Sequence, residues 1–349
     1  MNDNSKYIIS YKKKLYDALV QIDSMSKNSA RTLFVVNQNE QIIGTLTDGD
    51  IRRSLIKGVN VESSVKDVIH TNFKYLDEQS IDVRLVRKIK NEGIFLIPVL
   101  SHDRKIVDII DLQENTSYLP IDAVLMAGGK GERLRPLTEK KPKPLIKVGD
   151  KAIIDYNVDR LINYGVRHIN VTVNYLADQL EKHFEVSRNG IKIKTIREPK
   201  FLGTIGSIKF IQHIQNDVVL VMNSDLFTNI DYEDFFLHFM EHNADMSVAS
   251  VPYIVKIPYG VFNLDGRQIK GVEEKPAYSY YANAGIYLIK KELLNFIPSD
   301  TFYNATDFMS SLIQKGFNVI RFPISGYWID IGQHDELERA REIAKHIRS

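Results

Sequence analysis

The sequence predicts an α/β protein with a mostly parallel sheet and helices on both faces, preceded by a smaller α+β module. Three observations lead to this prediction. Strand-like and helical segments alternate from residue 121 onward, a glycine-rich loop directly follows the first of these strands, and the first 115 residues contain a weak internal repeat. Such alternation is typical of parallel sheets, because a parallel crossover needs a connecting helix.

Length and composition indicate a soluble chain of two domains. The chain has 349 residues, 44% hydrophobic and 26% charged, with a formal net charge of +2 and no cysteine. The small net charge argues against a nucleic-acid binder, and the lack of cysteine excludes disulfides and thiolate metal sites. No apolar run suits a membrane helix and the first residues do not resemble an export signal, so we expect a cytoplasmic protein without membrane attachment.

The repeat lies in the N-terminal module, residues 1–115. Residues 33–51 run through an apolar segment, a polar turn, an apolar pair and an acidic end, and residues 97–114 repeat this order. Each copy should form two hairpin-connected strands beside helices, and helical spacing also occurs at 64–70 and 81–93. The segment that follows has no periodicity and ends in proline, so we place a linker at 116–120.

The second domain is expected to span 121–349. Its predicted strands are 121–127, 168–173, 191–196 and 217–225, and its first helix is 152–165. In sheets of this type ligands bind beyond the carboxyl ends of the strands. The glycine loop and Asp225 both follow strands at such ends.

The glycine loop belongs to the stretch LMAGGKGERLRPLTEKKPKPL (125–145). It has neither the spacing of a Walker loop nor that of the dinucleotide fingerprint. Glycines here let backbone N–H groups approach an anion, while Arg133 and Lys143 offer donors suited to phosphate oxygens. A solvated basic turn is the alternative for a lone glycine pair.

The complete string, GGxGxRLxPLT followed by KPKPL, resembles the signature of the sugar-1-phosphate nucleotidyltransferases, the nucleotide-sugar pyrophosphorylases. Six further family-like motifs follow in order: LGTIGS (202–207), VMNSD (221–225), YGVF (259–262), VEEKP (272–276), ANAGIY (282–287) and YWIDIG (327–332). The resemblance implies a Rossmann-like, mostly parallel mixed sheet of the nucleotide-diphospho-sugar transferase type. It also implies that a sugar 1-phosphate attacks the α-phosphorus of a nucleoside triphosphate with the help of Mg²⁺, releasing pyrophosphate.

The resemblance also implies residue roles. Asp225 and Asp330 are the expected Mg²⁺ ligands, Arg133 is expected to grip the triphosphate, and Lys143 to support the phosphates at the reacting centre. The expected nucleotide-binding residues are Ala127, Gly128, Gly129, Gly131, Glu198, Gly203 and Thr204. The expected sugar-phosphate residues are Gly260, Glu274, Lys275 and Asn283. Plain structural roles are the alternatives: a helix cap for Asp225, a buried hydrogen-bonding carboxylate for Asp330, and a surface ion pair for Glu274 and Lys275.

Glu198 bears on the choice of base. A carboxylate there can accept hydrogen bonds from N1–H and N2–H of guanine, which favours GTP; a solvated loop residue is the alternative. Together with TDGDIRR (47–53), the chain is similar to bacterial glucosamine-1-phosphate guanylyltransferases of legionaminic acid biosynthesis. Mannose or heptose 1-phosphate with GTP, and hexosamine 1-phosphate with UTP, stay open. A non-catalytic nucleotide-sugar sensor is the alternative of a different class.

The N-terminal module resembles a CBS-domain pair, a module that commonly senses adenine nucleotides. By this resemblance Thr47, Asp50 and Arg52 are ligand candidates. The second repeat departs from the pattern, because Asp108 replaces the glycine and Asp111 the hydroxyl residue, so we expect at most one effector site. A ligand-free dimerisation module is the alternative, and we expect a homo-oligomer.

The segment HFMEH (238–242) matches the inverted zinc-protease pattern H-x-x-E-H. His238 and His242 would share one helix face. Because no third ligand follows in a recognisable context, we interpret the segment as an ordinary amphipathic helix.

Overall fold

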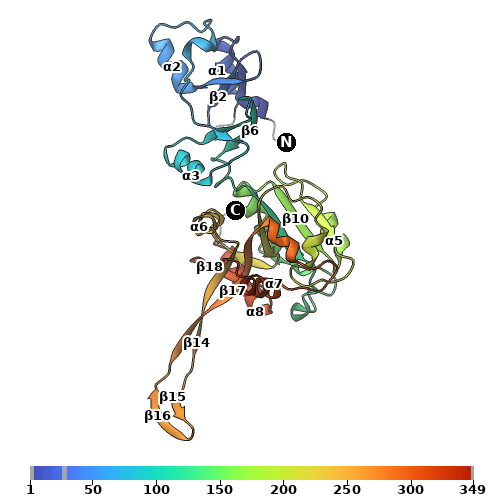
Figure 1. Ribbon diagram of the computed structural model, residues 1–349. Coiled ribbons are helices and arrows are strands. Elements are labelled where there is room, and N and C mark those ends of the chain that lie inside the picture. Colours follow the sequence, from blue (N-terminus) through green and yellow to red (C-terminus); the bar gives the residue numbers. More distant parts are fainter. Residues whose placement is uncertain (1–3, 26–29, 347–349) are drawn as a thin grey trace. The chain divides into compact units, whose positions relative to one another are not determined.

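The computed structural model describes residues 4–25 and 30–346 (Figure 1). The chain forms two compact units. The first contains the residues up to Pro120 together with Ile162–Val166 and Asn189–Ile191, and the second contains the remainder. The segment 116–120 lies at the end of the first unit's main part. None of the described helices is long and apolar enough to cross a membrane.

The first unit contains two small sheets of the same design. One has the strands β1 (Ile8–Ser10), β2 (Thr32–Val36) and β3 (Ile42–Thr47), and the other has β4 (Leu76–Asp77), β5 (Leu96–Leu100) and β6 (Ile106–Asp111). In each sheet the first two strands are parallel and the last two form a hairpin. Both hairpins carry a register shift at the corresponding place, between Val35 and Val36 and between Val99 and Leu100. The repeat in the sequence is therefore a repeat of structure.

In the described part of this unit the sheets are accompanied by the helices α1 (Leu15–Asp23), α2 (Asp48–Ile56) and α3 (Val83–Asn91). The helix expected at 64–70 is wrong, since only a short 3-10 turn forms at Val65–Val68. The chain becomes extended at Ile69, and His70 exchanges backbone hydrogen bonds with Thr45 of β3. Pairing with the neighbouring strand therefore overrides the helical spacing.

The second unit contains a seven-stranded sheet in the order β11-β10-β7-β12-β17-β14-β18. Its strands are β7 (Ile121–Ala127), β10 (His168–Val173), β11 (Lys194–Arg197), β12 (Val218–Asn223), β14 (Met246–Lys256), β17 (Ala277–Lys290) and β18 (Val319–Pro323). Only β17 runs antiparallel to its neighbours, so the predicted mostly parallel, mixed sheet is confirmed. The strand expected at 191–196 is displaced and begins at Lys194.

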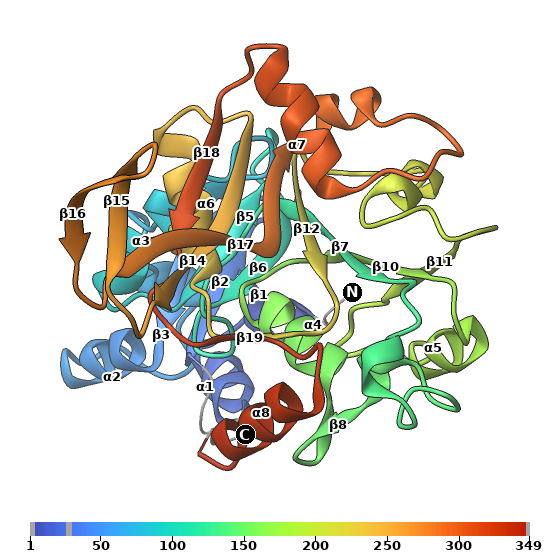
Figure 2. The ribbon, with the colours of Figure 1, turned by 90° about the horizontal axis from the view of Figure 1, so that it is seen from below.

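Helices cover both faces of this sheet. They are α4 (Ile153–Asn163), α5 (Ala177–His183), α6 (Tyr232–Glu241), α7 (Ala305–Gln314) and α8 (His334–Ala344). Phe308 of α7 packs in one cluster with Val219 and Val221 of β12, whereas the Tyr232 hydroxyl of α6 contacts the sulfur of Met222, the residue after Val221. Successive strand residues point to opposite faces, so α6 and α7 lie on opposite sides. Figure 2 shows α4 on the side opposite α7 as well.

The H-x-x-E-H segment lies on α6, which buries Phe235, Leu237 and Phe239. The rings of His238 and His242 lie 4.2 Å apart, and Nδ1 of His242 hydrogen-bonds the carbonyl oxygen of His238 at 2.9 Å. Among the described residues no group of three or more His, Asp or Glu side chains is placed to hold a metal ion. The segment is an amphipathic helix packed on the sheet.

Strands β14 and β17 continue beyond the sheet as a two-stranded ribbon that ends in the hairpin β15 (Val261–Asp265) and β16 (Gln268–Glu273). We call residues 251–282 the arm. Figure 1 shows the arm running away from the rest of the second unit. The sequence did not indicate this extension, because a ribbon in solvent has the same alternating pattern as a strand of the sheet.

Candidate active site

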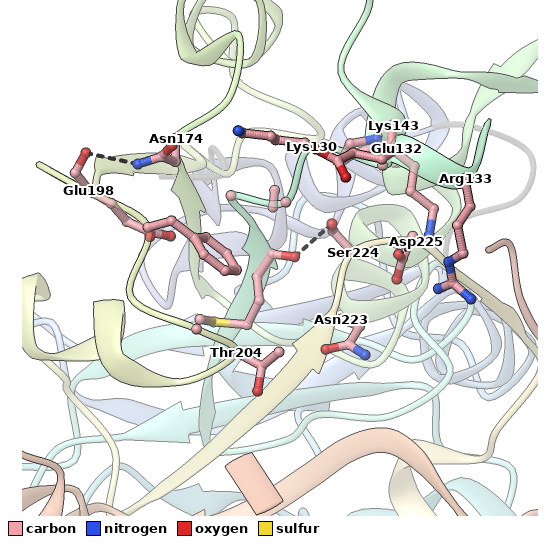
Figure 3. Close-up of a pocket in the computed structure, with 18 residues that line it drawn as sticks. Lys130, Glu132, Arg133, Lys143, Asn174, Glu198, Thr204, Asn223, Ser224 and Asp225 are labelled. Atoms are coloured by element: carbon pink, nitrogen blue, oxygen red, sulfur yellow. Dashed lines mark hydrogen bonds and ion pairs between the residues drawn. The ribbon is translucent and has the colours of Figure 1, made fainter. Parts of the chain in front are cut away.

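A cavity of about 630 Å³ lies at the carboxyl ends of β7 and β12 (Figure 3). Ten residues that the sequence assigned to the site line it: Ala127, Gly128, Gly129, Gly131, Arg133, Lys143, Glu198, Gly203, Thr204 and Asp225. Eight more residues complete the lining: Met126, Lys130, Glu132, Pro144, Asn174, Phe201, Asn223 and Ser224. The cavity is thus where the open-sheet rule expects a ligand.

Some of the additional lining residues carried a signal in the sequence. Asn174 directly follows β10, and Asn223 and Ser224 stand at the end of β12 beside Asp225. The strand-end rule that selected Asp225 would also have selected them. Phe201 carried no such signal, because it lies in a loop whose path depends on the whole fold.

Lys143 is the positive centre of the site. It is buried at the start of a 3-10 turn, Lys143–Leu145, and its ammonium forms an ion pair with Asp225. Its Nζ also lies 3.8 Å from Oδ1 of Asp330. Figure 3 shows Lys143, Arg133 and Asp225 together on one side of the cavity.

A short strand pair brings the two aspartates together. Strand β13 (Leu226–Thr228) pairs antiparallel with β19 (Trp328–Asp330), with Leu226 opposite Asp330. The backbone N–H of Ile331 donates to the carbonyl oxygen of Asp225 at 3.2 Å. Asp225 and Asp330 are therefore diagonal neighbours although they lie far apart in the chain.

This carboxylate pair fits a magnesium ion. Oδ1 of Asp225 is buried and has no hydrogen-bond partner among the described residues. Burial raises the pKa of the Asp330 carboxyl, and nearby Asp225 adds to this while Lys143 opposes it. Two carboxylates beside one ammonium leave an excess of negative charge and a free oxygen. Mg²⁺ commonly binds one or two carboxylates together with substrate phosphates, so these donors suit it.

Arg133 lies in the 3-10 turn Glu132–Leu134 that follows the glycines. Its guanidinium is close to Gly332, because a β-carbon on that glycine would lie 3.1 Å from the nearest guanidinium nitrogen. Glu336 accepts hydrogen bonds from the N–H groups of Gly332 and Gln333, at 2.8 and 2.9 Å. The backbone between β19 and α8 is therefore held in place by Glu336, and the Arg133 guanidinium lies next to it.

Glu198 is a buried carboxylate of the cavity wall. Glu198 is only 4% exposed, so the alternative that it is a solvated loop residue is wrong. Its Oε2 accepts a hydrogen bond from the N–H of Leu202 at 3.2 Å, and a β-carbon on Gly128 would lie 2.6 Å from its Oε1. Burial raises the pKa of the Glu198 carboxyl, and the Leu202 N–H opposes this.

The loop at 203–204 packs against the first turn of α7. Gly203 has φ +79°, and a β-carbon there would lie 2.6 Å from the carbonyl oxygen of Tyr303. The Thr204 hydroxyl accepts a hydrogen bond from the N–H of Ala305 at 2.9 Å. A glycine is required at 203 by both its backbone angle and this contact.

Comparison with known proteins identifies the family. The family described as "Nucleotidyl transferase" matches residues 122–346. The chain belongs to the nucleotidyl transferase family. The matched residues include every cavity-lining residue, with Asp225 among them, and also Asp330, which lies next to Lys143 but does not line the cavity. The motifs read from the sequence thus lie in a true family domain.

Named relatives of this nucleotidyl transferase differ in substrate. The chain is 32% identical over 216 residues to a "Putative mannose-1-phosphate guanyltransferase" of Sulfolobus acidocaldarius, covering 61% of this chain and 60% of that protein. It is 29% identical over 232 residues to a "UTP--glucose-1-phosphate uridylyltransferase" of Synechocystis, covering 60% of each. The chain therefore spans about three fifths of the length of these relatives.

Solved structures agree on the fold. A crystal structure of a "Putative Glucose-1-Phosphate Thymidylyltransferase" from Bacillus anthracis matches with a TM-score of 0.52 at 26% identity, covering 66% of this chain and 97% of that one. HddC from Yersinia pseudotuberculosis also matches with a TM-score of 0.52, at 25% identity, covering 64% of this chain and 99% of that one. Both likenesses support an α/β nucleotidyl transferase fold.

The predicted sugar-phosphate residues of this nucleotidyl transferase are not among the cavity-lining residues. Gly260, Glu274 and Lys275 lie on the arm, where a β-carbon on Gly260 would lie 3.1 Å from Oε2 of Glu274. Asn283 lies on β17 and donates to the Tyr287 hydroxyl at 2.8 Å. Their role in sugar binding stays a prediction.

The three ligand candidates of the N-terminal module lie at the start of α2. Thr47 and Asp50 form a capping box, in which Asp50 N–H donates to the Thr47 hydroxyl at 3.1 Å and Thr47 N–H donates to the Asp50 carboxylate at 2.9 Å. Arg53 donates to the same carboxylate at 2.6 Å, and Arg52 is exposed. These contacts give Thr47 and Asp50 a helix-capping role that needs no ligand.

Proposed function

We propose that this nucleotidyl transferase is a magnesium-dependent sugar-1-phosphate nucleotidyltransferase. The observation that carries the proposal is the charge cluster beside the glycine loop. Lys143 and Asp225, both of the cavity lining, form an ion pair, and Lys143 also approaches Asp330. Family membership supports the reaction class. An inactive sensor that only binds nucleotide sugars would be expected to lack some of the metal carboxylates and phosphate-binding residues. This chain has all five of them: Arg133, Lys143, Asp225, Lys275 and Asp330.

The arrangement suits in-line transfer between two polyanions. A sugar 1-phosphate is already an anion at neutral pH and needs no general base, so the barrier lies in positioning and charge neutralisation. Asp225 and Asp330 would hold Mg²⁺, which when bound supplies electrostatic stabilisation to the phosphate oxygens. Lys143, buried in the cavity wall, is held by its ion pair with Asp225 where it can support the phosphates at the reacting centre. Arg133 supplies a planar set of donors for the triphosphate.

We infer GTP as the nucleotide. Glu198 presents a buried carboxylate in the cavity. This carboxylate can accept hydrogen bonds from two adjacent donors of guanine, N1–H and N2–H. Uracil has one such donor, N3–H, and can form only one of these bonds. Guanylyltransferase relatives support this inference. The uridylyltransferase relative supports UTP as the alternative.

For the sugar we propose glucosamine 1-phosphate, because the catalytic motifs in combination with TDGDIRR (47–53) resemble glucosamine-1-phosphate guanylyltransferases. Mannose 1-phosphate is the alternative that the names of the relatives support, and heptose 1-phosphate is a further one. The deciding experiment incubates the protein with Mg²⁺ and each pairing of four nucleoside triphosphates with these sugar 1-phosphates, and measures pyrophosphate release. Release with GTP and one sugar supports the proposal. No release with any pairing, together with binding of a nucleotide sugar, would establish a sensor instead.

The metal assignment is tested by Asp225→Asn and Asp330→Asn. Each change removes a charge from the carboxylate pair, so we expect turnover to fall by at least about a hundredfold, as for other groups that stabilise transition-state charge. Asp217→Asn is the matched control, because Asp217 is exposed just before the opposite end of β12. Loss of activity in the control, or its retention in both site variants, would contradict the assignment.

We further propose that the N-terminal module is a CBS pair with one adenine-nucleotide site near α2. Its two equivalent hairpins support the assignment of a paired module. A nucleotide bound there can change turnover only if it binds two states of the enzyme with different affinity. Calorimetry with AMP, ADP and ATP tests the site, and Arg52→Ala is the informative variant because it leaves the capping box intact. No heat with any of the three nucleotides would leave a dimerisation module.

A further inference from the structure

The hairpin at the end of the arm is patterned for burial on one face. Phe262 lies opposite Val272, and Leu264 lies opposite Ile269. Residues opposite one another in an antiparallel pair share a face, so these four apolar side chains form one stripe. Each is 55–62% exposed.

The other face of the same hairpin is polar. Along β15, Asn263 and Asp265 alternate with Phe262 and Leu264 and lie opposite Gly271 and Gln268. Glu273 lies opposite Val261, and the strand pair has a register shift between Asn263 and Leu264. An antiparallel pair with one apolar and one polar face normally packs its apolar face on something. Across residues 4–25 and 30–346, β15 pairs with β16 in a two-stranded sheet, and no third strand of that part of the chain extends this hairpin.

The ribbon below the hairpin adds to the exposed apolar surface. Tyr253 lies opposite Tyr280, and both are about 60% exposed. An exposed apolar surface of this extent marks an interaction site, because a surface of this kind left uncovered promotes aggregation. The arm carries four basic and three acidic residues, so its charge favours neither nucleic acid nor a strongly charged protein.

The position of the arm relative to the cavity points to its partner. Strand β14 is parallel to β12, since both run antiparallel to β17. The arm therefore leaves the sheet at the edge that holds the cavity. Residues 251–257 are extended, and the N–H of Ile257 donates to the carbonyl oxygen of Pro276 at 3.0 Å. At about 3.3 Å per residue, Lys275 lies on the order of 20 Å beyond that edge.

We propose that two copies of this chain exchange their arms, so that the apolar face of each arm packs on the partner and its Glu274 and Lys275 reach the partner's cavity. A two-fold axis that brings the two cavity edges together makes the exchange reciprocal. The inference that Glu274 and Lys275 act in the partner's cavity rests on the proposed function. The inference that two copies form a dimer through the arms does not.

The area of the arm is sufficient for a dimer. Five aromatic residues on the arm are 55–74% exposed: Tyr253, Tyr259, Phe262, Tyr280 and Tyr281. At roughly 200 Å² for each aromatic side chain, they offer about 600 Å² per arm. Tyr280 and Tyr281 are successive residues of β17 and point to opposite faces, so this area is buried in full only where the partner covers both faces of the ribbon. Two exchanged arms then bury about 1,200 Å², which is the lower end of stable interfaces.

The dimer is tested by sedimentation of the full-length chain and two matched variants. Phe262→Asp puts a charge on the apolar face and Asn263→Asp puts the same charge on the polar face of the same strand. We expect wild type and Asn263→Asp to form dimers, and Phe262→Asp to raise the dimer dissociation constant at least tenfold. A monomeric wild type, or equal behaviour of the two variants, overturns the proposal.

The exchange is tested by a purified heterodimer of one Lys275→Ala chain and one Asp225→Asn chain, each with its own affinity tag. If Lys275 acts in the partner's cavity, one of the two sites is intact and turnover is about half that of wild type. If it acts in its own chain, both sites are damaged and turnover is lost, which overturns the exchange. A wild-type chain without turnover refutes the proposed function instead, and sedimentation then still decides the dimer.

Discussion

Replacing the buried carboxylate of Glu198 by an amide separates base recognition from folding. Glu198→Gln keeps the shape of the side chain and leaves an oxygen to accept the Leu202 N–H, which donates at 3.2 Å. The remaining position becomes an NH₂ group, which faces a guanine donor instead of accepting from it. A hydrogen bond to a charged group contributes about 1.5–3 kcal/mol. We therefore expect kcat/KM for GTP to fall roughly 10- to 150-fold, and kcat/KM for UTP to fall by less, because uracil offers Glu198 one donor and guanine offers two.

The same variant should be more stable than wild type at neutral pH. Burial raises the pKa of Glu198 in the folded state, so the fold disfavours the carboxylate. The resulting loss of stability begins above the unfolded pKa, near 4.3, and grows as the pH rises through the folded pKa. Thermal unfolding should show Glu198→Gln ahead of wild type at pH 7 and equal to it near pH 4.

Glu185→Gln is the matched control for both measurements, because Glu185 is exposed beyond α5. It should change neither the GTP preference nor the pH dependence of unfolding. An unchanged GTP preference in Glu198→Gln would refute the role in base recognition. An unchanged melting temperature at pH 7 would refute the energetic cost that we assign to the buried carboxylate.

Two further changes test the loop at 203 and the cap of α2. Gly203→Ala should lower the free energy of unfolding, measured with denaturant, more than Gly316→Ala does. Both glycines have a positive φ, which costs an alanine about 1–2 kcal/mol. At Gly203 the added β-carbon would also clash with the backbone of Tyr303, whereas at Gly316 it would meet no other atom. Equal losses would contradict the close contact. Asp50→Asn should lower the melting temperature more at pH 7 than at pH 3. Burial raises the pKa of Asp50, but hydrogen bonds from Thr47 and the Arg53 pair outweigh it and lower the pKa. The stabilisation therefore begins to be lost below the unfolded pKa near 3.9 and is lost fully as the pH falls through the folded pKa. A constant difference between pH 7 and 3 would contradict this.

The sequence by itself determined the local elements of the sheet and the loop that opens the site. The run Ile121–Ala127 forms β7, and the glycines follow it directly. The run at 152–165 forms α4 and ends at Asn163, before Gly165. These features depend on local properties of the chain, namely the periodicity of apolar residues and the conformational freedom of glycine. They can therefore be predicted without knowledge of the tertiary structure.

Only the tertiary structure decided which distant side chains meet. Asp225 and Asp330 become neighbours through the pairing of β13 with β19, and Glu198 is buried because Gly128 of another element leaves room for it. The arm is a further case, since its strands have the same alternation whether they lie in a sheet or in solvent. Burial, charge proximity and the partner of an exposed face all depend on contacts between separate segments, which no local pattern specifies.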